Sequence, residues 1–185
     1  MEQSDLQKLL LKTAVCTIAC DGEIHEKEIA EMHSMVYQAV CFRDFNGAEL
    51  LQTMLDAVST EGRQFLHEYI ENLKSADLSI VQELLILEVI LRIVYADERF
   101  DSNEEMFLKL VMSHLKVHSE VVLQRFGQIP LISDDDLQSY KESDYVSDID
   151  KISKNYDEIK LKAEDVVISE KVYSTDIELK ENQEN

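Results

Sequence analysis

One eight-residue pattern occurs twice in this sequence, as DGEIHEKE at residues 21–28 and as DERFDSNE at residues 97–104. Each copy begins with Asp, has one large apolar residue at its fourth position and ends with Glu. Each copy also lies between two stretches in which apolar residues recur at spacings of three and four, the period of an amphipathic helix. The pattern therefore predicts the corner of a helical hairpin, built twice.

The apolar residues around the two corners repeat as well. When the first hairpin is shifted by 76 positions, Leu10 meets Ile86, Ile18 meets Val94 and Ile24 meets Phe100, and six further apolar pairs align. We interpret this as a duplicated helical hairpin with approximate two-fold symmetry. In such a packing the corners lie either at one end of the bundle or at opposite ends, and both arrangements are compatible with the repeat.

The composition predicts an all-α fold. Among 185 residues, 45% are hydrophobic, whereas only one is Pro and four are Gly, too few turn residues for an all-β fold. We expect a compact bundle of about seven helices within one domain, residues 1–132. Their predicted ranges are about 5–20, 26–40, 48–59, 62–73, 80–96, 102–115 and 120–126, the last capped by Ser119. Residues 80–96 are apolar nearly all round, which predicts a central helix, with Glu88 and Arg92 paired one turn apart.

An acidic extension is predicted after this domain. Residues 133–185 contain 16 acidic and 7 basic side chains, a composition typical of a solvated, disordered segment. Within it, Ile149, Ile152, Tyr156 and Ile159 follow one another at spacings of three, four and three. This spacing predicts a short amphipathic helix near residues 148–161, which either forms transiently or docks on this domain or on a protein partner.

The charge of the whole chain limits its partners. A formal net charge of −20 repels phosphate backbones and anionic lipids, which argues against nucleic acid as a partner and against membrane attachment. Cations and proteins with a basic face are compatible with it. The three cysteines, together with an acidic N-terminus unlike a secretory signal, predict a reduced, cytoplasmic setting. No apolar stretch approaches the roughly 20 residues that a transmembrane helix needs.

The corner residues suit helix capping. His25 and Asp101 occupy the expected N-cap positions, and Glu28 and Glu104 follow three residues later, as in a capping box. Capping alone does not require the four acids and one base that each copy contains. Two carboxylates about 4 Å apart near a surface repel by about 4 kcal/mol at an effective dielectric constant of 20. Three interpretations follow: caps alone, caps with a site for a hard cation, or an acidic docking face.

The first corner also carries a family resemblance. Residues 17–24, TIACDGEI, together with Glu28, their counterpart at residues 95–104 and the helical layout resemble the tellurite-resistance protein TerB family, which is related to the N-terminal region of some membrane-anchored DnaJ-type co-chaperones. The resemblance covers about residues 1–130. It implies a seven-helix bacterial cytoplasmic domain linked to stress, tellurite or phage resistance. The sequence departs from the family pattern at Glu98, where Gly is preferred, and in the acidic extension.

From this resemblance we expect a divalent cation, calcium above all, to bind at the carboxylates. The expected metal ligands are Asp21, Glu28, Asp97 and Glu104. The sequence contains neither a Gly-rich phosphate loop nor a nucleophile elbow, so we expect a protein that is not an enzyme. Its predicted function is to couple cation binding to a protein partner, with Ile149, Ile152, Tyr156 and Ile159 as the partner-binding residues. The alternative is an adaptor or scaffold in a stress or phage-defence complex, whose corners are only helix caps.

Overall fold

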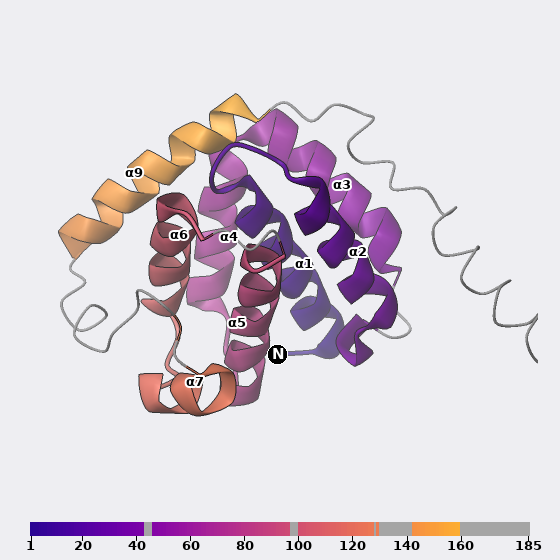
Figure 1. Ribbon diagram of the computed structural model, residues 1–185, viewed down its shortest axis with the longest axis vertical. Coiled ribbons are helices and arrows are strands. Elements are labelled where there is room, and N and C mark those ends of the chain that lie inside the picture. The colour runs from indigo at the N-terminus through magenta and orange to yellow at the C-terminus, as the bar shows by residue number, and fades with distance from the viewer. Residues whose placement is uncertain (43–45, 97–99, 128, 130–141, 160–185) are drawn as a thin grey trace, which may run out of the picture.

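A computed structural model describes residues 1–42, 46–96, 100–127, 129 and 142–159, and within this part every regular element is a helix (Figure 1). The α-helices are α1 (Gln3–Ala19), α2 (Glu26–Gln38), α3 (Gly47–Glu61), α4 (Arg63–Ser75), α5 (Ile80–Val94), α6 (Ser102–Met112), α7 (Ser119–Phe126) and α9 (Glu142–Glu158), with the short 3₁₀ helix η1 (Val40–Phe42) after α2. The all-α class and the seven helices before residue 130 are confirmed. None of the described helices is both long and apolar enough to cross a membrane.

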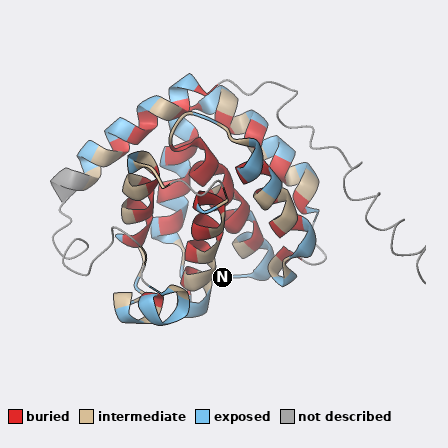
Figure 2. Ribbon diagram, viewed as in Figure 1, coloured by how far each residue is buried: buried red, intermediate tan, exposed pale blue. Residues whose placement is uncertain are grey.

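Helices α1 and α5 form the centre of the bundle, since they contact one another more extensively than any other pair of described helices. Leu10 and Val15 of α1 and Ile86 and Ile90 of α5 are each 0% exposed. In Figure 2 the buried residues accordingly concentrate on the inner helices, while the outer helices show exposed stripes. The central position predicted for α5 from its nearly continuous apolar sequence is therefore confirmed.

The prediction that Glu88 and Arg92 pair with each other within α5 is wrong. Arg92 pairs with Glu31 of α2, and Arg125 of α7 donates to Glu88 at 2.9 Å. Each of the two side chains thus finds an opposite charge on a neighbouring helix, and each pair ties α5 to the helix beside it. The predicted cap of α7 is also displaced by one residue, because His118 occupies the N-cap position and Ser119 is the first helical residue.

Helix α9 packs against α3, α4 and α6 (Figure 1). It begins six residues before the predicted start, and its spaced apolar residues are buried in this domain: Ile149 and Ile159 at 5% exposure, Tyr156 at 1% and Ile152 at 0%. Residues 142–159 therefore belong to the packed domain, beyond the boundary expected at 132. Residues 133–141 and 160–185 of the predicted extension lie outside the described residues.

Candidate metal site at the helix corners

The first corner joins α1 to α2 through a tight turn. Gly22 adopts a φ of +84°, a backbone conformation that residues other than glycine rarely take. The Asp21 carboxylate accepts a hydrogen bond from the backbone N–H of Glu23 at 2.9 Å, which closes the turn. At the start of α2, the backbone N–H of His25 donates to Glu28 Oε2 at 3.1 Å. Asp21 and Glu28 therefore fix the shape of this corner, as the capping interpretation predicted.

The second corner ends in a complete capping box at the start of α6. Asp101 Oδ1 accepts from the backbone N–H groups of Asn103 at 2.7 Å and Glu104 at 2.9 Å, while the backbone N–H of Asp101 donates to Glu104 Oε2 at 2.8 Å. The capping role predicted for Asp101 and Glu104 is confirmed. Asp97, the remaining predicted metal ligand, lies outside the described residues.

The two corners meet at one end of the bundle, beside Cys20. This thiol is fully buried, and burial is the main reason why its pKa is raised well above the ordinary value. The carboxylates of Asp21, Glu104, Asp101 and Glu28 raise its pKa further, so residues from both corners lie close enough to act on one sulfur atom. Of the two arrangements compatible with the repeat, the structure has the corners together.

The Asp21 carboxylate lies in an environment that disfavours its ionised form. Its side chain is only 18% exposed. Burial raises its pKa above the ordinary value, and the charges of Asp101 and Glu23 raise it further, whereas the hydrogen bond from the Glu23 N–H and the nearby His25 lower it. His25 Nε2 lies 3.8 Å from Asp21 Oδ2. A positive charge at this position would stabilise the ionised carboxylate.

Glu28 and Glu104 occupy equivalent and unusually buried positions. Their exposed fractions are 4% and 7%, although glutamate is rarely buried to this extent. Each uses one carboxylate oxygen to accept the N–H of its own N-cap residue. The repeat thus places one buried carboxylate in the first turn of α2 and one in the first turn of α6.

The donor chemistry of the corners favours hard cations. Carboxylate oxygens are the ligands that Ca²⁺, Mg²⁺ and Mn²⁺ prefer. The Cys20 thiol stays protonated because its pKa is raised, so it does not supply the thiolate that a soft metal needs. Within the described part of the chain, no group of three or more His, Cys, Asp or Glu side chains is placed to hold a metal ion.

Two contributors to this region were not predicted from the sequence. Asp101 was expected only as a cap, although its charge acts on Asp21. Asn155 of α9 donates to the carbonyl oxygen of Cys20 at 2.8 Å, directly before the first corner. The sequence feature that could have identified Asn155 was its position between Ser153 and Tyr156, on the buried side of an amphipathic helix. Away from the corners, the buried Glu83 in the first turn of α5 also had no sequence signal beyond its position in an apolar helix.

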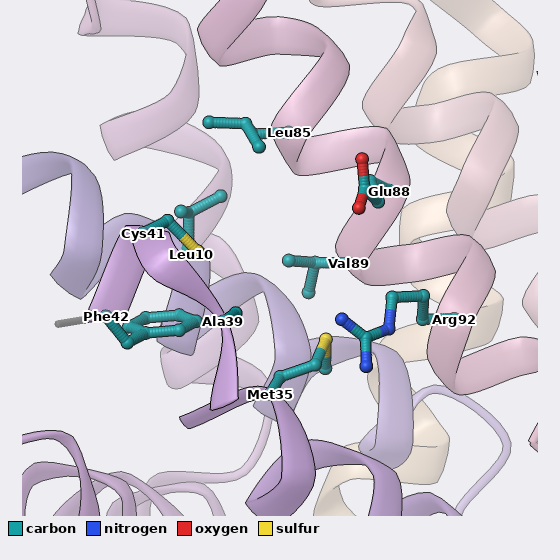
Figure 3. Close-up of a pocket in the computed structure, with 9 residues that line it drawn as sticks. All are labelled: Leu10, Met35, Ala39, Cys41, Phe42, Leu85, Glu88, Val89 and Arg92. Carbon is teal, nitrogen blue, oxygen red and sulfur yellow. The ribbon is translucent and has the colours of Figure 1, made fainter. Parts of the chain in front are cut away.

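A separate pocket opens between α1, α2, η1 and α5 (Figure 3). It is small, with a volume of about 30 Å³, and is lined by Leu10, Met35, Ala39, Cys41, Phe42, Leu85, Glu88, Val89 and Arg92. Its two charged residues, Glu88 and Arg92, are already engaged in ion pairs with neighbouring helices. Burial raises the pKa of the half-buried Cys41 thiol. The lining thus offers an apolar surface and no acid–base pair for catalysis.

The fold and site define a helical domain with paired acidic corners. The model of one protein family, tellurite resistance protein TerB, matches residues 9–124, which include both corners and extend from α1 into α7. The chain belongs to this TerB family, as its resemblance implied. No curated protein and no solved structure matches the chain significantly. The family match ends before α9 begins.

Proposed function

We propose that this TerB-family domain is a non-enzymatic module that binds a divalent hard cation, with calcium as the preferred ion, where its two acidic corners meet. The cation-bound domain then engages a protein partner in a stress response of the tellurite-resistance type. The observation that carries the proposal is that carboxylates from both corners lie close enough to Cys20 for their charges to raise the pKa of its thiol. A duplicated hairpin needs each cap separately, but folding alone does not require the two acidic caps to be brought together.

Asp21 is the main candidate ligand, because its carboxylate is largely buried and is opposed by the charge of Asp101. With it we propose the sequence-predicted ligands Glu28, Asp97 and Glu104, and we add Asp101. Because the described carboxylates among these are not gathered into a metal-binding group, a bound cation would have to draw them closer together. Cations of this class also take backbone carbonyl and water oxygens, so side chains need not supply every ligand. A bound cation would replace repulsion between carboxylates with attraction, which favours the folded state.

Thermal unfolding of the full chain with calcium, manganese or magnesium tests this proposal. A ligand that binds only the folded state raises the free energy of unfolding by about 2.7 kcal/mol at 100 times its dissociation constant. We expect this stabilisation with calcium. We expect it to be lost when Asp21→Asn is combined with Asp97→Asn, since both corners lose a ligand.

The matched control neutralises two carboxylates that are remote from the corners. Asp5 lies in the first turn of α1, at the opposite end from Asp21, and Glu120 lies on α7, and both are exposed. Asp5→Asn combined with Glu120→Gln removes the same charge and should leave the calcium effect intact. Equal stabilisation of both double variants, or no stabilisation of the unsubstituted chain by any of the three ions, would contradict the cation site.

The alternative is an adaptor whose corners are only caps. Two observations favour it: the capping hydrogen bonds account for the buried Glu28 and Glu104, and the apolar pocket offers a place for a partner. The segment that lines this pocket also carries Tyr37 and Val40, which are 57% and 72% exposed. An adaptor of this kind should bind its partner equally well in calcium and in chelator, whereas the cation-binding module should bind it only with the cation.

A further inference from the structure

Helix α9 binds to one face of the bundle, formed by α3, α4 and α6, which we call the α9-binding face (Figure 1). Buried and exposed residues alternate along the helix, so only one of its sides meets the bundle (Figure 2). The buried side carries the apolar residues Ile149, Ile152, Tyr156 and Ile159, which are 5% exposed or less. A helix that lays such a stripe on a complementary apolar surface is a common mode of recognition between proteins.

Two hydrogen bonds fix the register of α9 on this face. The Asn155 side chain donates to the carbonyl oxygen of Cys20 at 2.8 Å. The hydroxyl of the buried Tyr156 donates to the carbonyl oxygen of Cys16, one turn earlier in the chain. A helix shifted by one residue would lose both bonds, so the face selects where along a helix the Tyr must stand.

A basic residue at the start of α4 receives the acidic end of α9. Arg63 donates to the Asp157 carboxylate from its guanidinium at 2.6 Å and from its backbone N–H at 3.0 Å. Gly62 leaves room for this carboxylate, since a Cβ atom added there would lie 2.6 Å from Asp157 Oδ1. The hydrogen bond and the charge of Asp157 raise the pKa of Arg63, and so does the charge of Asp150. This end of the face therefore attracts an acidic helix.

The fit of α9 on this face has one defect. Ser153 is 2% exposed, and its hydroxyl has no hydrogen-bond partner among the described residues. A buried hydroxyl without a partner weakens docking, because it has given up its hydrogen bonds to water. A helix with a small apolar residue at this position would avoid that loss. Such a helix would bind the same face more tightly than the sequence of α9 does.

We propose that the α9-binding face is a binding site for an amphipathic helix of a protein partner, and that α9 occupies it until that helix takes its place. The partner helix would carry apolar residues at the spacing of α9, a Tyr followed directly by Asp, and a small apolar residue where α9 has Ser153. The family match ends at residue 124, so α9 lies outside the family domain that it covers. The proposal stands without the cation site, because these contacts use no carboxylate of the corners.

Binding of a fluorescently labelled peptide of residues 142–159 to the full chain, in chelator, tests the proposal. The tethered α9 competes at a high effective concentration, so it must first be weakened. Ile152→Asp places a charge at a position that is 0% exposed and should release α9. We expect the peptide to bind this variant about tenfold or more tightly than the unsubstituted chain, because the free face is more populated. Val146→Asp adds the same charge at a position that is 51% exposed and should bind like the unsubstituted chain.

Amide hydrogen exchange of α1 and α5 shows whether the Ile152→Asp bundle remains folded. If it unfolds, α9 is a permanent part of the domain and the proposal is overturned. Equal binding of the peptide to folded Ile152→Asp and to Val146→Asp would overturn it as well. A dimer of the unsubstituted chain that is lost in Ile152→Asp would assign the face to α9 of a second copy, and not to a partner.

Variants of the peptide, titrated against the Ile152→Asp chain, test how the face recognises a helix. Ser153→Ala in the peptide should tighten binding by about fivefold or more, since it removes the unpartnered hydroxyl. Asp157→Ala in the peptide should weaken binding by about threefold, in the range of an exposed ion pair. That loss should be smaller when the chain also carries Arg63→Ala. No gain from Ser153→Ala, or an unchanged loss from Asp157→Ala, would contradict binding in the register of α9.

Discussion

The Asp21 carboxylate is largely removed from water and faces a second acid, Asp101. Because its pKa is raised in the folded state, its contribution to stability is present below the ordinary value of 3.8 and is lost as the pH rises through the raised value. At pH 7 the charge therefore opposes folding. We predict that Asp21→Asn raises the melting temperature at pH 7 in the presence of a chelator, and a lower melting temperature would contradict this.

Asp101 caps α6 through two backbone N–H groups. Loss of such a cap lowers stability by about 1 kcal/mol, within a range of about 0.5 to 2. We predict this loss for Asp101→Ala in denaturant-induced unfolding. Asn is as good an N-cap residue as Asp, so Asp101→Asn should retain nearly all of the stability. A similar loss in both variants would show that charge, and not capping, is what Asp101 contributes in the absence of a cation.

Glu83 is 2% exposed, and its Oε2 accepts the backbone N–H groups of Lys116 at 3.0 Å and Val117 at 2.7 Å, just before α7. Glu83→Ala leaves both donors without this acceptor, and each unsatisfied buried group costs about 1 to 3 kcal/mol. We predict a loss of stability in this range or above it in urea-induced unfolding. Glu83→Gln keeps an acceptor oxygen and should be milder. A change within about 0.5 kcal/mol, typical of surface substitutions, would rule out this role.

At the scale of the elements, the sequence predicted helices more reliably than their contacts. Apolar spacing identified all seven helices of the family domain and the buried face of α9, because each helix must bury one face. It did not identify what α9 docks on. Tyr156 and Asn155 meet Cys16 and Cys20, which are 140 and 135 positions away. Local spacing carries no information about contacts at that distance.

The ends of the helices show the same limit. The capping boxes were predicted at His25 and Asp101, where the acidic pattern drew attention. The equivalent box at Ser79, whose hydroxyl and backbone pair with Gln82, was not predicted, although Ser followed three positions later by Gln is the same signal. Glu88 and Arg92 suited a local pair equally well, and only the packing of α2 and α7 against α5 directed them elsewhere.

The Arg63–Asp157 pair fastens the end of α9 and should make its docking sensitive to acid. Hydrogen bonds from Arg63 hold the pKa of Asp157 below its ordinary value of 3.8. Its contribution is therefore present above 3.8 and is lost as the pH falls through the lowered value. After correction for intrinsic rates, we predict faster α9 exchange in Asp157→Asn than in the unsubstituted chain at pH 6, and a smaller difference at pH 3. A difference independent of pH would contradict this.

For the whole molecule, the decisive feature is that the two corners share one end of the bundle. The repeat predicted two equivalent acidic corners but left their relative position open, because the position depends on how α1 packs against α5. The symmetry of the sequence also paired Asp21 with Asp97, which lies outside the described residues. Within the described residues, the charge of Asp101 acts on Asp21. His25 occupies the position in the first copy that Asp101 occupies in the second, so the two copies differ in charge at their N-cap positions.

Paramagnetic manganese tests most directly whether one cation joins the two corners. In nuclear magnetic resonance spectra of the full, isotope-labelled chain, we predict that substoichiometric Mn²⁺ selectively broadens the amide signals of residues 20–28 and 100–104 together, and that added calcium restores them. Broadening of one corner alone, or broadening spread over the acidic surface and unaffected by calcium, would contradict the shared site.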